Sequence, residues 1–171
     1  DKDKEQEKIN SFSNFLQQKG TIDILCLQEI NSYTAQVMLE KFNFKHEHKI
    51  PYKGASILSQ HPILQSGEVE FTTNANSCVW ADIKINDETI RVYSLHLKSN
   101  NVSDETERIL SERELKEKKT WSDIKGIFGK FRFNSKIRIQ QAIKVKSHIE
   151  KSPYPTILCG DFNETPQSYV Y

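Results

Sequence analysis

The sequence contains no long apolar run. The longest unbroken runs are four residues, such as residues 24–27, whereas a membrane-spanning helix needs roughly 18 or more. No transmembrane segment or signal peptide is therefore expected in this chain. Localisation stays open, since a cytoplasmic, an exported and a membrane-anchored parent protein all agree with it. The sequence also lacks a Gly-rich phosphate loop, a Walker pattern and a nucleophile elbow, which disfavours the chemistries that depend on them.

Cysteine is scarce as well. The three residues Cys26, Cys78 and Cys159 are odd in number and lack metal-type spacing, so they predict neither a disulfide framework nor a thiolate metal site. Because Cys26 and Cys159 lie within apolar runs, and Cys78 resembles them, we expect three small buried thiols. A reducing compartment is permitted by this pattern and not required by it.

What the chain does have is enough apolar material for one core. Its 171 residues are 36% apolar and include 9 Phe, 6 Tyr and 2 Trp. This composition argues against disorder, and the length predicts a single domain over residues 1–171. The formal net charge is only +1, but residues 113–151 hold twelve Lys or Arg against four Asp or Glu. Such a stretch could attract a phosphate-bearing substrate, but for a charge run taken alone the solvated face of a helix is the favoured interpretation.

Hydrophobic spacing predicts both helices and strands. We expect helices over 1–20, over 33–42 and in a segment that ends at Pro153. The first helix has an apolar stripe made of Ile9, Phe12, Phe15 and Leu16. The last helix has one made of Ile139, Ala142, Ile143 and Ile149. Helical character is also expected over 105–118, and a flexible stretch over 126–129. Short apolar or alternating runs predict strands over 22–27, 55–59, 68–71, 78–85, 90–97 and 156–159.

Two of these strands form a predicted β-hairpin. Asn86-Asp87 supplies the turn, and period two places Val79, Ala81, Ile83 and Ile85 on one face of the first strand. In the second strand, Ser94 and His96 share a face with Ile90 and Val92. Helices mixed with an antiparallel hairpin indicate an α/β or α+β fold rather than a plain Rossmann sheet.

Two carboxylates follow buried strands. Glu29 and Asp161 each stand at a strand's carboxyl end, where ligand sites of layered α/β proteins gather. A pair of carboxylates suits Mg²⁺, which takes its other ligands from water and substrate phosphates. The alternative for each acid is a helix cap or a turn. In the Gly-Asp-Phe-Asn turn, Asp161 and Asn163 stand two apart, where one could activate water and the other donate to phosphate.

Histidines are the remaining candidates. His96 lies late in its strand, where it is either a catalytic group or a satisfied core residue. Four others lie in polar or loop settings and are expected at the surface, namely His46, His48, His61 and His148. Tyr52 and Asn100 are loop residues near predicted strand ends.

Five blocks in order carry a resemblance. They are DILCLQE (23–29), GASILSQHPI (54–63), VYSLHLKS (92–99), RIQQAIKV (138–145) and ILCGDFNETPQSYVY (157–171). Apart from GDFN each block is weak alone, but together they are specific. From residue 23 onward the chain resembles the endonuclease/exonuclease/phosphatase superfamily, which has the DNase I-like fold. The last block is similar to bacterial members.

The resemblance implies a four-layer sandwich of two packed β-sheets flanked by helices, with a divalent-metal site, Mg²⁺ or Mn²⁺, at one edge. It implies that Glu29 is a metal ligand and that His96 contacts the scissile phosphate or acts as an acid. Asp161 would orient or deprotonate the attacking water beside the metal, and Asn163 would hold the phosphate. Some relatives carry a phosphate-contacting residue at the position of Tyr52.

The family pattern also contains blocks that this sequence does not show. They are a first strand with an asparagine, a late aspartate block and a terminal Ser-Asp-His block, and Ser94 stands where many relatives have asparagine. We therefore expect an incomplete domain whose uncovered strand edges favour aggregation. Two hypotheses follow, a metal-dependent phosphoesterase and a non-catalytic interaction module that retains the family fold. Nucleic acids, inositol phosphates and sphingolipid headgroups are all substrates within the family, and oligomeric state stays open.

Overall fold

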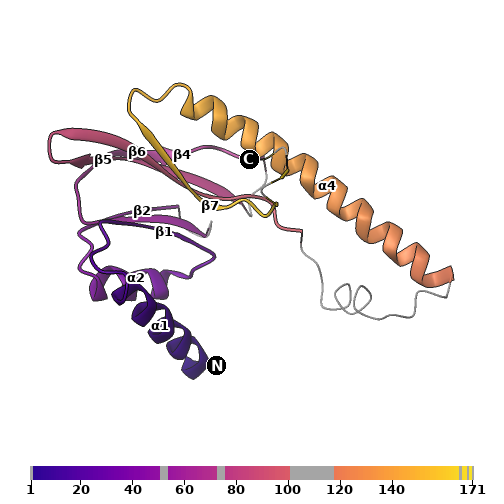
Figure 1. The fold of residues 1–171 in the computed structure, drawn as a ribbon, viewed down its shortest axis with the longest axis horizontal. Coiled ribbons are helices and arrows are strands. Elements are labelled where there is room, and N and C mark those ends of the chain that lie inside the picture. Colours follow the sequence, from indigo (N-terminus) through magenta and orange to yellow (C-terminus); the bar gives the residue numbers. More distant parts are fainter. Residues whose placement is uncertain are drawn as a thin grey trace.

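The structure is a computed structural model that describes residues 2–50, 54–72, 76–100, 118–165, 167–168 and 170. Its elements stack in four layers (Figure 1). Two helices, α1 (Lys2–Gln17) and α2 (Ser32–Lys41), cover one sheet, and the long helix α4 (Lys118–Ile149) covers the other. The predicted sandwich of two sheets between helices is therefore confirmed. None of the described helices is both long enough and apolar enough to cross a bilayer.

The first sheet has three antiparallel strands in the order β1-β3-β2. They are β1 (Ile24–Gln28), β2 (His46–Lys49) and β3 (Ala55–Ser59). Every residue of β3 is buried, because this strand lies in the centre of the sheet between two other layers. The register pairs Gln28 at the end of β1 with Ala55 at the start of β3.

The second sheet has four strands in the order β4-β5-β6-β7. They are β4 (Ile63–Glu68), β5 (Ser77–Ile85), β6 (Glu88–His96) and β7 (Thr156–Asp161). The hairpin of β5 and β6 is confirmed, with Asn86 at a φ of 54° in the tight turn where asparagine is tolerated. β7 pairs in parallel with β6, which brings the ends of both strands, His96 and Asp161, opposite one another.

Three apolar clusters hold the layers together. One joins α1 and α2 to the first sheet, and its buried members are Ile9, Leu16, Leu27, Met38, Phe44 and Leu58. The second lies between the sheets and includes Val79, Ala81, Ile83 and Val92 from the hairpin face predicted above. The third joins α4 to the opposite face of the hairpin, through Cys78, Tyr93, Leu95, Leu97 and Val145. Alternation along β5 and β6 thus fills two separate interlayer cores.

Several predicted boundaries were wrong. The strand predicted over 68–71 is β4, which ends at Glu68, and its outward residues Leu64 to Ser66 are exposed, so no clear alternation marked it. Strand β2 was missed because its HEHK sequence is wholly polar. The stretch 126–129 is part of α4 and not a flexible segment. Each glycine costs a helix only about 1 kcal/mol, which a long helix offsets by burying residues such as Ile127 and Val145.

Burial also differs from some expectations. Phe15 and Ile143 were expected on the apolar stripes of their helices, but both side chains are exposed. Strand β7 is an edge strand among those described, and its side chains Ile157 and Leu158 are exposed as well. Cys78 is buried as predicted, but Cys26 and Cys159 are only partly buried. Burial, followed by the charge of Glu68, raises the pKa of the Cys78 thiol to about 12.

The other histidines are less exposed than a surface location implies. His46 and His48 lie in β2 and are half-buried. His148 packs against Trp80 and hydrogen-bonds through Nδ1 to the Tyr93 hydroxyl at 2.8 Å. Desolvation, and then the charges of nearby cations, lower the pKa of His148. Tyr52 and the helix predicted over 105–118, apart from its last residue, lie outside the described residues.

Candidate functional site

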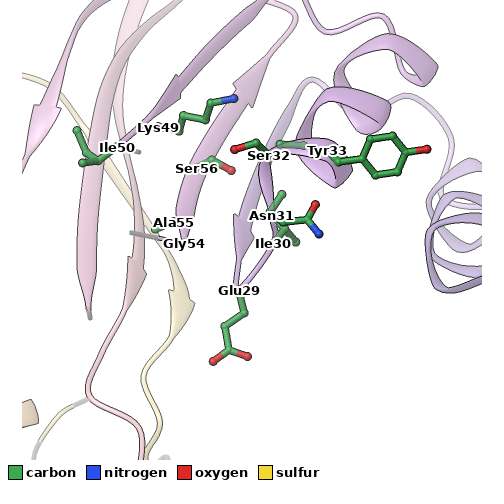
Figure 2. Close-up of a pocket in the computed structure, with 11 residues that line it drawn as sticks. Glu29, Ile30, Asn31, Ser32, Tyr33, Lys49, Ile50, Gly54, Ala55 and Ser56 are labelled. Carbon is green, nitrogen blue, oxygen red and sulfur yellow. The ribbon is translucent and has the colours of Figure 1, made fainter. Parts of the chain in front are cut away.

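The candidate site forms where strands from both sheets end side by side. β1 of the first sheet lies against β6 and β7 of the second. Glu29 directly follows β1 with a φ of 55°, and its backbone N–H donates to the carbonyl of Gly54 at 2.8 Å. This turn leaves the Glu29 side chain 69% exposed (Figure 2).

His96 lies at the end of β6 beneath Glu29. Its Nε2 is 3.3 Å from Oε1 of Glu29, although its side chain is only 9% exposed. That approach lacks hydrogen-bond geometry, and Nε2 is a buried nitrogen with no hydrogen-bond partner in the described part of the chain. Unpaired buried polar atoms are rare and costly, so this nitrogen makes His96 a candidate site residue. The structure thus places His96 beside one predicted acid, Glu29, and opposite the other, Asp161.

The Gly-Asp-Phe-Asn turn after β7 is held by short hydrogen bonds. Oδ1 of Asp161 accepts from the backbone N–H of Asn163 at 2.8 Å, which forms a tight turn with Asn163 at a φ of 52°. The side-chain amide of Asn163 donates to the Leu97 carbonyl at 3.0 Å, and the N–H of Leu97 donates to the carbonyl of Asp161 at 2.9 Å. These bonds fix the turn against the chain that leaves β6.

Gly160 is required for this arrangement. Its φ is 149°, and a Cβ there would lie 2.0 Å from the backbone oxygen of Leu95 on β6. Any side chain would push β7 away from β6, and with it Asp161 away from His96. The glycine of the GDFN motif therefore lets the two strands approach closely.

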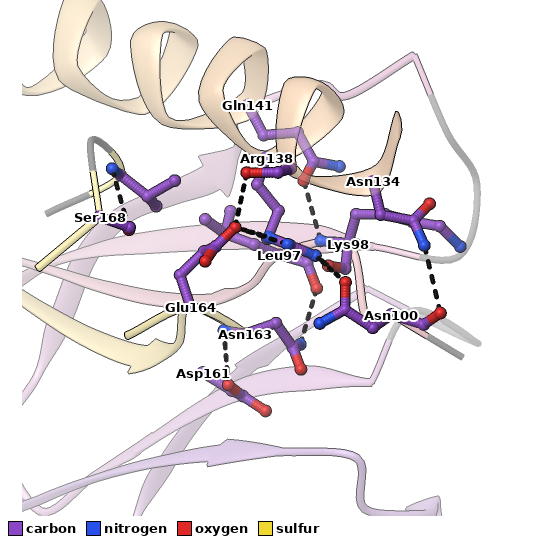
Figure 3. Close-up of polar contacts among 12 residues, drawn as sticks. Leu97, Lys98, Asn100, Asn134, Arg138, Gln141, Asp161, Asn163, Glu164 and Ser168 are labelled. Carbon is purple, nitrogen blue, oxygen red and sulfur yellow. Dashed lines mark hydrogen bonds and ion pairs between the residues drawn. The ribbon is translucent and has the colours of Figure 1, made fainter. Parts of the chain in front are cut away.

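A buried arginine ties α4 to the loops that follow both strands (Figure 3). Arg138 is 2% exposed and donates to Glu164, to the Lys98 carbonyl at 2.8 Å and to Oδ1 of Asn100 at 2.9 Å. Ser135 also donates to Glu164, at 2.7 Å. The sequence analysis gave Arg138 no role, although its place on the buried stripe of α4, with Ala142 and Val145, was a usable signal.

The electrostatics of Glu164 follow from this clamp. Burial alone would raise the pKa of its carboxyl group. The hydrogen bonds from Ser135 and Arg138, together with the guanidinium charge, outweigh that effect and lower the pKa of Glu164. Glu164 therefore carries a charge at neutral pH that Arg138 compensates, and the pair fixes the loop immediately after Asn163.

Two contacts connect the sheets just behind the site. Nε2 of Gln28 on β1 donates to the hydroxyl of Ser94 on β6 at 2.9 Å. Ser94, which stands where the family pattern has asparagine, thus links the sheets directly. Beside it, the neighbouring thiol of Cys159 and then burial raise the pKa of Cys26 well above its usual range. Both the Gln28–Ser94 and the Cys26–Cys159 contacts join the two sheets, and no local pattern in the sequence indicates such a contact.

Two hollows adjoin these residues. A cavity of about 630 Å³ next to Glu29 is lined by the start of α2, the end of β2 and the start of β3 (Figure 2). A wider groove of about 1100 Å³ runs between α4 and the turn that carries Asp161 and Asn163. Both hollows therefore open beside candidate residues, the first beside Glu29 and the second beside Asp161 and Asn163.

The donor set fits a magnesium-type ion better than a zinc ion. Among the described residues, no group of three or more His, Cys, Asp or Glu lies close enough to hold a metal by itself. A closed zinc site needs three or four such ligands, whereas Mg²⁺ is commonly held by one or two carboxylates together with water and substrate phosphates. Glu29 and Asp161 are both solvent-accessible and both adjoin His96, so they are the candidate carboxylates for such an ion.

Two stacked sheets between helical layers, with acidic strand ends at one edge, define the class of this protein as an α/β sandwich. The chain belongs to the Endonuclease/Exonuclease/phosphatase family, whose model matches residues 1–171. The resemblance found in the sequence is thus confirmed. A search of curated proteins found no match.

Solved structures share the fold, which is DNase I-like. Humanized D. rerio TDP2 carrying 14 mutations is 16% identical, with a TM-score of 0.67 over 97% of this chain and 59% of that one. A Bacteroides thetaiotaomicron family member is 16% identical, with a TM-score of 0.66 over 97% and 58%. Sphingomyelinase C from Streptomyces griseocarneus is 14% identical, with a TM-score of 0.60 over 87% and 54%. The chain therefore spans less than two thirds of these relatives.

Proposed function

We propose that the protein is a phosphoesterase that hydrolyses a phosphodiester or phosphomonoester by attack of water assisted by Mg²⁺ or Mn²⁺. The observation that carries this proposal is that His96 lies 3.3 Å from Glu29 and is the register partner of Asp161 on the neighbouring strand. Family membership supports it, as do the names of the structural relatives, which include a sphingomyelinase and a TDP2 bound to single-stranded DNA product.

Each residue has a role that suits its surroundings. Glu29 and Asp161 would hold the metal, which when bound neutralises charge on the phosphoryl group. Asp161 also orients water or takes its proton, and its hydrogen bond from Asn163 keeps the carboxylate in place. An amide NH₂ has two donors, so the bond from Asn163 to Leu97 leaves one for a phosphate oxygen. The buried Nε2 of His96 would hydrogen-bond to the reacting phosphate and stabilise its developing charge.

The first test is hydrolysis by the full-length protein of bis-p-nitrophenyl phosphate and p-nitrophenyl phosphate, with Mg²⁺ or Mn²⁺ and with EDTA. We expect metal-dependent release of nitrophenol. The Asp161→Asn variant should lower the turnover number far more than it weakens substrate binding, because Asp161 acts in the transition state.

Asp23→Asn is the matched control, since Asp23 is an exposed acid just before β1, at its opposite end from Glu29. It should leave turnover unchanged. Hydrolysis that persists in EDTA or survives Asp161→Asn would contradict the mechanism. A folded protein without hydrolysis of either ester would instead favour the non-catalytic interaction module.

A further inference from the structure

The groove beside Asp161 has a second wall that the proposed chemistry does not use. This wall is the amino-terminal half of α4, which contributes Phe128, Phe131, Arg132 and Lys136. Phe128 is 65% exposed, although large apolar side chains usually avoid water. Arg132 and Lys136 are exposed too. Aromatic and cationic side chains therefore line one hollow together with Asp161 and Asn163.

These side chains form one stripe along the helix. Phe128, Arg132 and Lys136 are spaced by four residues, so they lie on the same side of α4. At 1.5 Å per residue, the stripe from Phe128 to Lys136 is about 12 Å long.

The charge of this wall suits a polyanion. Arg132 and Lys136 are its exposed cations, and no described Asp or Glu of α4 lines the groove. Glu164 is the other acid among the residues that line the groove, and its charge is compensated by Arg138. A phosphate chain in the groove would thus lie against Arg132 and Lys136 and next to Asp161 and Asn163.

We propose that this groove binds a single-stranded nucleic acid, with bases stacked on Phe128 and Phe131 and phosphates paired with Arg132 and Lys136. The inference rests on the proposed function, because it names the substrate class of that same site. Base stacking on exposed aromatic rings combined with a cationic groove is the general mode of binding to single strands. A membrane surface fits less well, since the two rings line a hollow and not a protruding patch.

The test measures binding separately from catalysis. A fluorescein-labelled 12-nucleotide single strand is titrated with the full-length protein in EDTA, and anisotropy gives the dissociation constant. Phe128→Ala should weaken binding by roughly 5- to 150-fold, as for loss of one stacked base. The double variant Arg132→Gln and Lys136→Gln should reduce the slope of log affinity against log salt by about 1.4, at about 0.7 per lost phosphate contact on a single strand.

α4 offers matched controls. Phe133 is 64% exposed and Lys130 is exposed on the same helix, but neither lines the groove. Phe133→Ala and Lys130→Gln should bind like the wild type, and circular dichroism melts should show all variants folded.

The possible results separate the two proposals. Equal losses for Phe128→Ala and Phe133→Ala, equal affinity for duplex DNA, or binding to sphingomyelin vesicles in place of the oligonucleotide would each overturn the groove proposal. Hydrolysis of the small esters by a protein that does not bind the single strand would also overturn it while supporting the proposed function. Groove-dependent binding in a protein inactive on those esters would contradict the proposed function alone.

Discussion

His96 is the residue whose surroundings are hardest to explain by stability alone. A buried nitrogen without a hydrogen-bond partner costs about 1–3 kcal/mol, and this one lies within 3.3 Å of an exposed carboxylate. His148, by contrast, satisfies its Nδ1 with the Tyr93 hydroxyl and packs on Trp80. The two histidines thus differ in their surroundings, because Nδ1 of His148 has a hydrogen-bond partner and Nε2 of His96 has none among the described residues.

This contrast gives a prediction for the full-length protein. His96→Ala should lower the turnover number by roughly 10²- to 10⁴-fold, because a group that donates to the reacting phosphate is lost. Steady-state kinetics on bis-p-nitrophenyl phosphate measures it. His148→Gln is the control and should lower the melting temperature while leaving turnover near normal. Near-normal turnover in His96→Ala would return His96 to the role of a core residue.

At the scale of elements, α4 does more than cover the second sheet. Arg138 bonds to the loop after β6 through Lys98 and Asn100, and to the loop after β7 through Glu164. These loops adjoin His96 and Asn163. The helix therefore sets the relative position of the two strand ends that carry the site.

Removing this clamp should be costly. Arg138→Met leaves the part-buried Glu164 carboxylate with only Ser135 of the two side-chain partners described above, and because breaking a fully buried pair costs about 3–5 kcal/mol, we expect a loss of about 2–4 kcal/mol. Urea unfolding of the full-length protein at pH 7 measures that loss. Arg132→Met, which changes an exposed arginine on the same helix, should alter stability by less than about 0.5 kcal/mol.

The same pair should make stability depend on pH. Because the pKa of Glu164 is lower in the folded state, its stabilisation is complete above the ordinary glutamate value, roughly 4.3, and is lost as pH falls through the lower folded value. The stability of the wild type should therefore fall more steeply in acid than that of Arg138→Met. Parallel slopes for the two proteins between pH 6 and pH 3 would contradict this assignment.

At the scale of the whole molecule, the edges of the sheets are the notable feature. Among the described strands, β1 and β7 each pair on one side only. β7 exposes Ile157 by 48% and Leu158 by 37%, and exposed apolar edges are templates for association. Both edges belong to strands that end at the candidate site.

The sequence prediction of aggregation can now be stated by residue. A protein of only these 171 residues should self-associate or unfold with poor cooperativity, as light scattering after gel filtration and urea titration would show. Ile157→Lys should reduce the association, because a charge on an edge strand blocks pairing. Ile143→Lys, at an exposed position of α4, should not. A monomeric, cooperatively folding and active 171-residue protein would contradict the prediction.

Patterns within the sequence determined the hairpin of β5 and β6, the helices α1 and α2 and the strands that precede Glu29 and Asp161. Each depends on residues close in sequence, so periodicity and turn residues suffice. The ordered blocks, with GDFN the most specific, also indicated the family and the candidate site residues. Strand β2 and the full length of α4 escaped because a polar strand and a glycine-containing helix owe their stability to neighbouring layers.

Only the tertiary structure decided which residues meet. The contact of Glu29 with His96 joins two sheets across 67 positions, and the bonds of Arg138 join a helix to two loops. The tertiary structure also placed the exposed stripe of α4 beside Asp161, so that part of the basic segment forms one wall of a groove. Such contacts arise from the packing of layers, because side chains distant in sequence become neighbours only when each layer buries its apolar face against the next.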